Sequence, residues 1–291
     1  MRKILFPFLL VVLIASQSHA QRFVTTGDFD RISKVTVGPG LNTYFGELRR
    51  LGDQKLQAGL SFSLGYEHLM TDRLAIRTNL SVYKIQADDS FSRVPYKQDR
   101  NLNFKATNFE LAVQGMYYMF RHPHTGYRDR AFLNPYFHLG LGVTSNNPKA
   151  ELNGQIYELR PLALEGEQYG SIALIVPLGA GFNFYVTRNI DFQLDFQYTV
   201  ALTGYLDDVS TVYRDQASFS DTNGVDAATM AILSDPRTIL DPPLPAEPGG
   251  AARGDDTFDS YFRLGFKIGF YLPKSLYGKS SIRCRITKKT R

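Results

Sequence analysis

The sequence has a single cysteine, Cys284, and after its first 20 residues it has no long apolar run. One cysteine cannot form an intrachain disulfide, even in an oxidising compartment. A membrane-spanning helix needs a run of about 18 or more apolar residues, so any spanning segment beyond residue 20 must be a strand. Tryptophan is absent, and the 17 tyrosines and 21 phenylalanines would have to supply any aromatic belt at a membrane interface.

Residues 1–20 have the three parts of a secretory signal peptide. Arg2 and Lys3 form the positive start, residues 4–15 the apolar run, and residues 18–20 a small-x-small cleavage site. Pro7 interrupts the apolar run, which is also short for an anchor helix. We therefore expect export by the Sec route and cleavage before Gln21, and the lack of a cysteine there excludes a lipid-anchored lipoprotein.

Charge is distributed unevenly along the chain. The net charge is +5, and loss of Arg2 and Lys3 with the signal leaves +3. Residues 273–291 contain seven basic residues and no acid, so the rest of the mature chain carries −4. Such a tail can meet lipid phosphates, an acidic partner or only water. Nucleic acid is not expected, because the protein is exported and the tail lacks interleaved aromatic residues.

Apolar and polar residues alternate without a break from Ile190 to Leu202, which predicts a strand with one apolar and one polar face. Segments of this kind, bounded by turn residues, occur eight times. The predicted strands are residues 35–47, 56–69, 73–86, 104–119, 132–144, 171–186, 190–202 and 258–271.

Short and long connections alternate between these strands. Residues 70–72 and 187–189 are short turns, and 120–131 is a moderate one. The other connections, residues 48–55, 87–103, 145–170 and 203–257, are mostly longer. An even number of strands with this layout is typical of outer-membrane barrels, with short periplasmic turns, long outer loops and both termini in the periplasm. We expect a signal at 1–20, a lead-in at 21–34, a barrel at 35–272 and a basic periplasmic tail at 273–291.

A soluble eight-stranded barrel of the lipocalin type would show the same alternation. Side-chain size favours the membrane barrel, because the glycines of the strands lie on the polar face and the phenylalanines and leucines on the other. An eight-stranded lumen has no room for the bulky face, which therefore belongs in lipid. The predicted fold class is an all-β, eight-stranded, antiparallel, up-and-down transmembrane barrel.

The polar faces place several charged residues in the lumen, where unpaired charges are costly. Asp191 and Asp195 lie on the strand before Arg263 and Lys267, and we expect these acids and bases to face each other. We expect Glu67 and Arg77 to form a similar pair. A packed polar plug is favoured over an ion or proton path in so narrow a barrel. The predicted lumen ion-pair residues are Glu67, Arg77, Asp191, Asp195, Arg263 and Lys267.

No constellation for catalysis, metal or cofactor is evident. His122 and His124 flank a proline but lack an obvious third ligand, and His138 is expected to be a hydrogen-bonded lumen residue. A lipid-modifying barrel enzyme would need a histidine and a serine at the rim, and the sequence places no serine against His68 or His138. The acids at 207–208 and 255–256 could gather a cation between the two ends of the last loop, although solvated loop acids are the simpler interpretation.

Several segments resemble the PorG-like outer-membrane barrels of Bacteroidota, which are associated with type IX secretion and gliding. They are residues 133–150, 153–154 with 157–161, 165–167 with Tyr169, 177–181, Tyr213, Arg253-Gly254, Asp259 with Tyr261, and above all Tyr205, Leu206, Asp207, Asp208, Val209 and Ser210. The resemblance implies a non-enzymatic anchor or scaffold in outer-membrane lipid for a periplasmic ring of partner proteins. Our own interpretation of residues 205–210 is structural: the acids cap the turn or pair with Arg214 or Arg253, and so fix the loop as a plug or lid.

Because the ring is periplasmic, the short turns and the basic tail are the partner-binding candidates. The tail residues concerned are Lys274, Lys279, Arg283, Arg285, Lys288 and Lys289. The alternative function is a general envelope or adhesion barrel that uses its outer loops, residues 203–257 above all. A lipid-modifying enzyme is the third possibility.

Overall fold

The computed structural model describes residues 33–49, 53–54, 57–122, 131–187, 189–255 and 257–272. The predicted signal peptide, residues 21–32 of the predicted lead-in, His124, Cys284 and the basic tail from residue 273 onward lie outside the described residues. The predictions made for those segments stay predictions.

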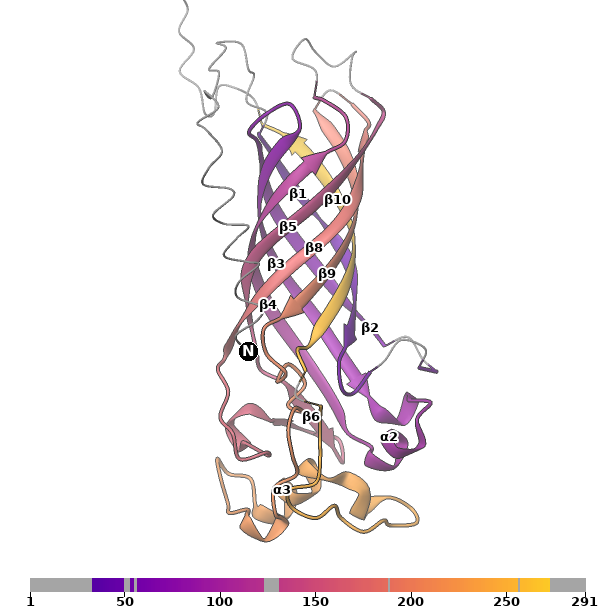
Figure 1. Ribbon diagram of the computed structural model, residues 1–291, viewed down its shortest axis with the longest axis vertical. Coiled ribbons are helices and arrows are strands. Elements are labelled where there is room, and N and C mark those ends of the chain that lie inside the picture. Colours follow the sequence, from indigo (N-terminus) through magenta and orange to yellow (C-terminus); the bar gives the residue numbers. More distant parts are fainter. Residues whose placement is uncertain are drawn as a thin grey trace, which may run out of the picture. The chain divides into compact units, whose positions relative to one another are not determined.

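Eight long strands form one closed antiparallel sheet (Figure 1). They are β1 (Ser33–Phe45), β2 (Ala58–Leu69), β3 (Leu74–Asp88), β4 (Asn103–Tyr118), β5 (Leu133–Ser145), β8 (Ile172–Tyr185), β9 (Ile190–Ala201) and β10 (Ser260–Tyr271). Each strand pairs with the strands before and after it in this series, and β1 pairs with β10 to close the barrel. The predicted eight-stranded, antiparallel, up-and-down barrel is therefore confirmed.

The strand limits lie within two residues of the predicted ones, because the period-two pattern ends where the ladder ends. β1 begins at Ser33, inside the range that we assigned to the lead-in. This correction matters for the interior, because it brings Lys34 into the barrel wall.

The long connections all lie at one end of the barrel and contain additional short elements (Figure 1). Those elements are η1 (Asp89–Phe91), α2 (Pro95–Arg100), β6 (Lys149–Leu152), β7 (Gln155–Glu158), η3 (Arg160–Leu162), η4 (Gln216–Ser218), α3 (Ala227–Ser234) and η5 (Pro236–Ile239). β3 and β4 stay paired as far as Asp88 and Asn103, and β6 joins β4 by one residue pair. Among the described residues, no helix has both the length and the hydropathy needed to cross a bilayer.

The outer face of the barrel is apolar and its inner face is polar. Leucine, isoleucine, valine and phenylalanine side chains on alternate strand positions are exposed, including Leu60, Phe62, Leu80, Phe109, Leu139 and Leu174. The side chains between them are buried, as the alternating burial of β2, β3 and β4 shows. Glycines line the crowded inner wall; a β-carbon added at Gly179 would collide with His138 and with the backbone of β9. An exterior of this kind is stable in lipid and would aggregate in water.

A charge placed on the lipid face tests this assignment. Leu139, at the middle of β5, is 61% exposed, and Ile156, in β7 of the loop region, is 64% exposed. Leu139→Arg should lower the free energy of unfolding in lipid vesicles by about 2–4 kcal/mol, because arginine at the bilayer midplane is poorly solvated. Ile156→Arg is the matched control and should change it by less than about 0.5 kcal/mol. Urea unfolding of the two refolded variants measures both values, and equal effects would contradict a membrane belt.

Candidate functional site

The charged side chains of the lumen form three clusters along the barrel. Nearest the short turns, Lys34 Nζ lies 2.9 Å from Asp191 Oδ2 and 3.1 Å from Glu67 Oε1. In the middle, Asp195 Oδ2 lies 2.7 Å from Lys267 Nζ and 3.2 Å from Arg77 Nη2. All of these side chains are buried, so each cluster is shielded from water.

His138, Arg263 and Tyr261 make further contacts with the acids of the lumen. His138 Nε2 lies 2.9 Å from Asp195 Oδ1, and nearer the loops Arg263 donates to both oxygens of Glu110, at 3.1 and 2.8 Å. Tyr261 also donates to Glu110, at 2.5 Å. A two-pronged contact between arginine and a carboxylate is the strongest form of such a pair.

The predicted pair of Asp195 with Lys267 on the neighbouring strand is confirmed, and the other partners differ from those that we predicted. Arg263 pairs with Glu110 on β4 and not with Asp191 or Asp195, and Arg77 pairs with Asp195 on β9 and not with Glu67. β3 and β9, like β4 and β10, are not adjacent in the sheet. In an eight-stranded barrel the lumen is narrow enough for a long basic side chain to reach the opposite wall. Glu67 and Asp191 share Lys34 instead.

An apolar cluster closes the lumen at its loop end, and Leu206 and Val209 of the 205–210 segment belong to it. The other members come from strand ends and adjoining loops: Tyr44, Leu48, Tyr83, Ile85, Ala87, Leu102, Phe104, Ala106, Ile175, Ala201 and Tyr261. A second apolar cluster, which includes Leu159, Leu162, Phe219 and Met230, packs the longer loops against each other. We call these ordered loops together the cap. The 205–210 segment thus fills the barrel mouth.

The cap holds the 205–210 segment through residues of two other segments. Glu165 accepts hydrogen bonds from the backbone nitrogens of Ser210 and Thr211, at 3.0 and 2.8 Å, and from Arg253 Nη1 at 3.0 Å. Arg253 Nη1 also donates to the carbonyl of Asp208, at 2.6 Å, and lies 3.6 Å from its Oδ2. A β-carbon at Gly254 would meet the backbone of Ser210 at 2.7 Å, so only glycine fits there.

Aromatic contacts fix the other side of the segment. The Tyr169 hydroxyl donates to Asp208 Oδ1 at 2.6 Å, and the Tyr169 and Tyr205 rings stack with their centroids 4.8 Å apart. Asp208 has a φ of 68°, a left-handed conformation that aspartate tolerates better than most residues. Burial raises the pKa of the Asp208 carboxyl to about 6, and the attraction of Arg253 opposes that rise.

Asp207 and Asp208 are buried, so the interpretation of these residues as solvated loop acids is wrong. The sequence could not reveal this, because the residues that cover them lie on distant loops. Asp208 faces Arg253, one of the two partners considered, whereas Arg214 donates to Ser218. Asp207 Oδ1 caps the turn by accepting from the backbone nitrogen of Val209 at 3.0 Å.

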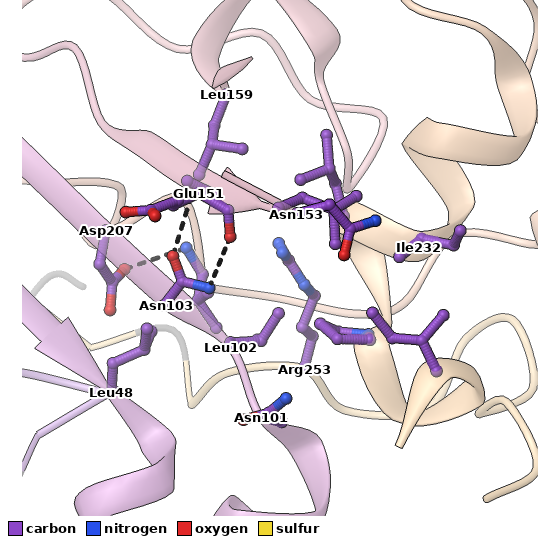
Figure 2. Close-up of a pocket in the computed structure, with 16 residues that line it drawn as sticks. Leu48, Asn101, Leu102, Asn103, Glu151, Asn153, Leu159, Asp207, Ile232 and Arg253 are labelled. Carbon is purple, nitrogen blue, oxygen red and sulfur yellow. Dashed lines mark hydrogen bonds between the residues drawn. The ribbon is translucent and has the colours of Figure 1, made fainter. Parts of the chain in front are cut away.

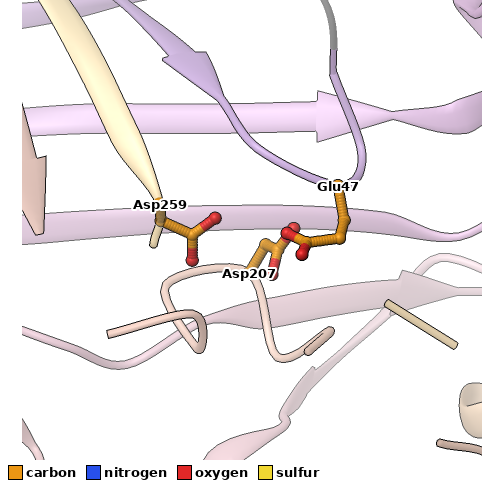
Figure 3. A group of neighbouring side chains, drawn as sticks. All are labelled: Glu47, Asp207 and Asp259. Carbon is orange, nitrogen blue, oxygen red and sulfur yellow. The ribbon is translucent and has the colours of Figure 1, made fainter. Parts of the chain in front are cut away.

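Three carboxylates from different segments meet beside this turn (Figure 3). Glu47 follows β1, Asp207 lies in the 205–210 segment, and Asp259 directly precedes β10. Within the part of the chain that the structure describes, only these side chains converge closely enough to share a metal ion. Burial raises the pKa of Asp207 to about 7 and that of Glu47 to about 9, and burial together with the charge of Asp207 raises the pKa of Asp259.

A cavity of about 210 Å³, with Asp207 in its wall, lies between the end of the β3–β4 hairpin, β6 and η5 (Figure 2). Leu102, Leu159 and Ile232 contribute apolar walls, and Asp207 and Arg253 contribute charge. Its volume is below the roughly 300–1,000 Å³ of small-molecule sites. We therefore assign it no ligand.

The histidines form structural hydrogen bonds, with one pairing that the sequence did not suggest. His122 lies against Tyr185, and His138 binds Asp195 in the lumen. The Ser33 hydroxyl lies 2.7 Å from His68 Nδ1, near the short-turn end of the barrel, and Tyr66 donates to Ser33 at 3.0 Å. The expectation that no serine faces His68 is therefore wrong. Ser33 was hidden from sequence reasoning because it lay in the supposed lead-in.

No family model and no curated protein matches this chain. Several solved structures of bacterial barrels are similar to it. The outer membrane protein OprG of Pseudomonas aeruginosa matches with a TM-score of 0.41 and 11% identity, over 83% of this chain and 96% of OprG. Neisserial surface protein A matches with a TM-score of 0.40 and 11% identity, over 82% of this chain and 96% of that one. Ail, the attachment invasion locus protein of Yersinia pestis, matches with a TM-score of 0.38 and 11% identity, over 83% and 99%.

Removal of a lumen charge should be far more damaging than removal of an exposed one. Asp195 and Lys267 lie 2.7 Å apart in the lumen, and Glu151 and Lys105 lie 2.7 Å apart on the surface of the loop region. Asp195→Asn should lower the free energy of unfolding by about 3–5 kcal/mol, because Arg77 and Lys267 lose their buried counter-ion. Glu151→Gln should lower it by at most about 1 kcal/mol. Urea titration of folded protein in detergent measures both, and similar values would contradict a sealed lumen.

Truncation of the buried Leu206 side chain should loosen the cap and leave the barrel intact. Leu206 is fully buried in the apolar cluster, whereas Val212 in the same loop is 41% exposed. Leu206→Ala should destabilise the cap by about 2–5 kcal/mol, and Val212→Ala by much less. Limited proteolysis should therefore cleave residues 202–259 faster in Leu206→Ala alone. Loss of heat-modifiable migration in electrophoresis, which reports the folded barrel, would instead show that the segment is needed for barrel folding.

Proposed function

We propose that this protein is an outer-membrane barrel that serves as a non-enzymatic anchor or scaffold for partner proteins. One observation carries the proposal: the lumen is filled by buried ion pairs and its mouth is closed by an ordered cap. A barrel so filled offers no path for a solute, and its lipid face is occupied by the membrane. The surfaces left for other proteins are the two ends.

The finer proposal is that the partners are the periplasmic ring proteins of a type IX secretion or gliding complex. Its support is the resemblance of residues 205–210 and the accompanying segments to PorG-like barrels. The segments behind that resemblance lie far apart in the sequence, yet Glu165, Tyr169, Arg253 and Asp208 contact one another in the cap. They therefore act as one structural unit, which is what a shared sequence pattern would preserve.

Crosslinking pull-down from outer membranes tests this function. A tag inserted at the exposed turn Asn153-Gly154 leaves both ends of the chain unaltered. The tagged protein should recover periplasmic ring proteins in stoichiometric amount, and deletion of residues 273–291 should abolish that recovery, since we place the partner contacts on the basic tail. Arg253→Gln, which alters only the cap, should keep it.

Recovery of the barrel alone from a verified membrane fraction would contradict the scaffold function. Recovery of surface ligands that is lost only in Arg253→Gln would favour the second candidate, an adhesion or envelope barrel. The specific observation behind that candidate is the ordered cap, which exposes Tyr96, Ile156, Val212 and Ile239. Lipid hydrolysis that disappears in Ser33→Ala would contradict a non-enzymatic role.

A further inference from the structure

The three carboxylates at the barrel mouth are arranged differently from every charged group in the lumen. One side-chain oxygen from each of Glu47, Asp207 and Asp259 lies within 4.8 Å of the other two, and all three residues are buried (Figure 3). Two ligands of one calcium ion, bound at about 2.3–2.6 Å, can be at most about 5 Å apart. The spacing therefore suits three ligands of a single cation.

The carboxylate oxygens of this cluster outnumber the hydrogen-bond donors around them. The Tyr44 hydroxyl lies 2.7 Å from Asp207 Oδ2 and also contacts Asp259 Oδ1, but a phenol has one proton and can donate to only one of them. Glu47 Oε2 is buried and has no hydrogen-bond partner, although the Glu47 side chain points toward Asp207 (Figure 3). A buried carboxylate oxygen without a donor carries a large desolvation penalty.

Basic side chains lie nearby but serve other groups. Lys97 and Arg100 donate to the backbone carbonyl of Glu47 and not to its carboxylate. Arg100 is also held by Asp89, with 2.6 Å between Nε and Oδ2. Among the residues that the structure describes, no lysine or arginine lies within 4.0 Å of a carboxylate oxygen of Glu47, Asp207 or Asp259, whereas all four lumen acids have such a partner.

We propose that Glu47, Asp207 and Asp259 bind one calcium ion. Carboxylate oxygens alone select hard cations, and calcium accepts irregular coordination completed by water or carbonyl oxygens. The ion joins the end of β1, the 205–210 segment and the start of β10. It therefore fixes the 205–210 segment in the barrel mouth. This role of the ion does not depend on which partners the protein has.

Terbium luminescence tests the site directly, because terbium replaces calcium at oxygen sites and is sensitised by nearby tyrosine. The chain has no tryptophan, and Tyr44 adjoins two of the three ligands. Excitation of the folded full-length chain in detergent should give saturable terbium emission that calcium displaces. Glu47→Gln should weaken binding at least tenfold, and Glu151→Gln, the same change on the cap surface, should leave it unchanged. Calcium should also raise the melting temperature of the protein. Tyr44→Phe should lose most of the terbium emission and keep this rise.

The same titration can overturn the proposal. No saturable emission in the wild-type chain, or equal affinity in the wild type and Glu47→Gln, would exclude the site and leave protonation as the way in which these carboxylates are neutralised. Heat-modifiable electrophoresis confirms that each variant is folded. If Glu47→Gln does not fold, Asp259→Asn takes its place, with the same tenfold loss expected.

Discussion

The structure depends on charge neutrality inside a closed, narrow barrel. Eight strands leave a lumen that side chains can fill completely, so every charge placed there loses its water. The described strands contribute four acids, Glu67, Glu110, Asp191 and Asp195, and four bases, Lys34, Arg77, Arg263 and Lys267, and each has a partner of opposite charge within 4.0 Å. Most of these contacts join strands that are not adjacent, so the side chains tie the walls together as the backbone ladder does.

The cap extends this arrangement beyond the strands with a different interaction. Toward the loops the inner wall changes from polar to apolar, with Tyr83, Ile85 and Phe104 in place of Arg77 and Asn79, and Leu206 fills the space between them. Hydrophobic contacts of this kind are non-directional and need no exact pairing of atoms. The hydrogen bonds of Glu165 and Arg253 are directional, and they fix the orientation of the 205–210 segment.

The barrel followed from the sequence because its pattern is local. Period-two alternation and the position of glycine on the polar face are visible residue by residue, and they gave all eight strands and both faces. Of the ion pairs, Asp195 with Lys267 followed from the sequence, and the others did not, because the choice between a neighbouring strand and the opposite wall depends on the width of the closed lumen. Lys34 was missed for a smaller reason, since a boundary placed two residues late excluded it. In the cap, the contact between Glu165 and Ser210 joins loops with no period, and nothing in either segment points to the other.

Buried charges are therefore neutralised in two different ways, one in the lumen and one at the barrel mouth. In the lumen, acids and bases of the chain neutralise each other, so that region should be indifferent to the ions around it. At the mouth, Glu47, Asp207 and Asp259 have no such partner among the described residues, and their neutralisation must come from protons or from a bound cation. Long loops of membrane barrels face outward. In that orientation, the ion pairs inside the membrane-embedded barrel do not depend on the solution outside. The cap, whose stability depends on protons or on a bound cation, is the part that contacts that solution.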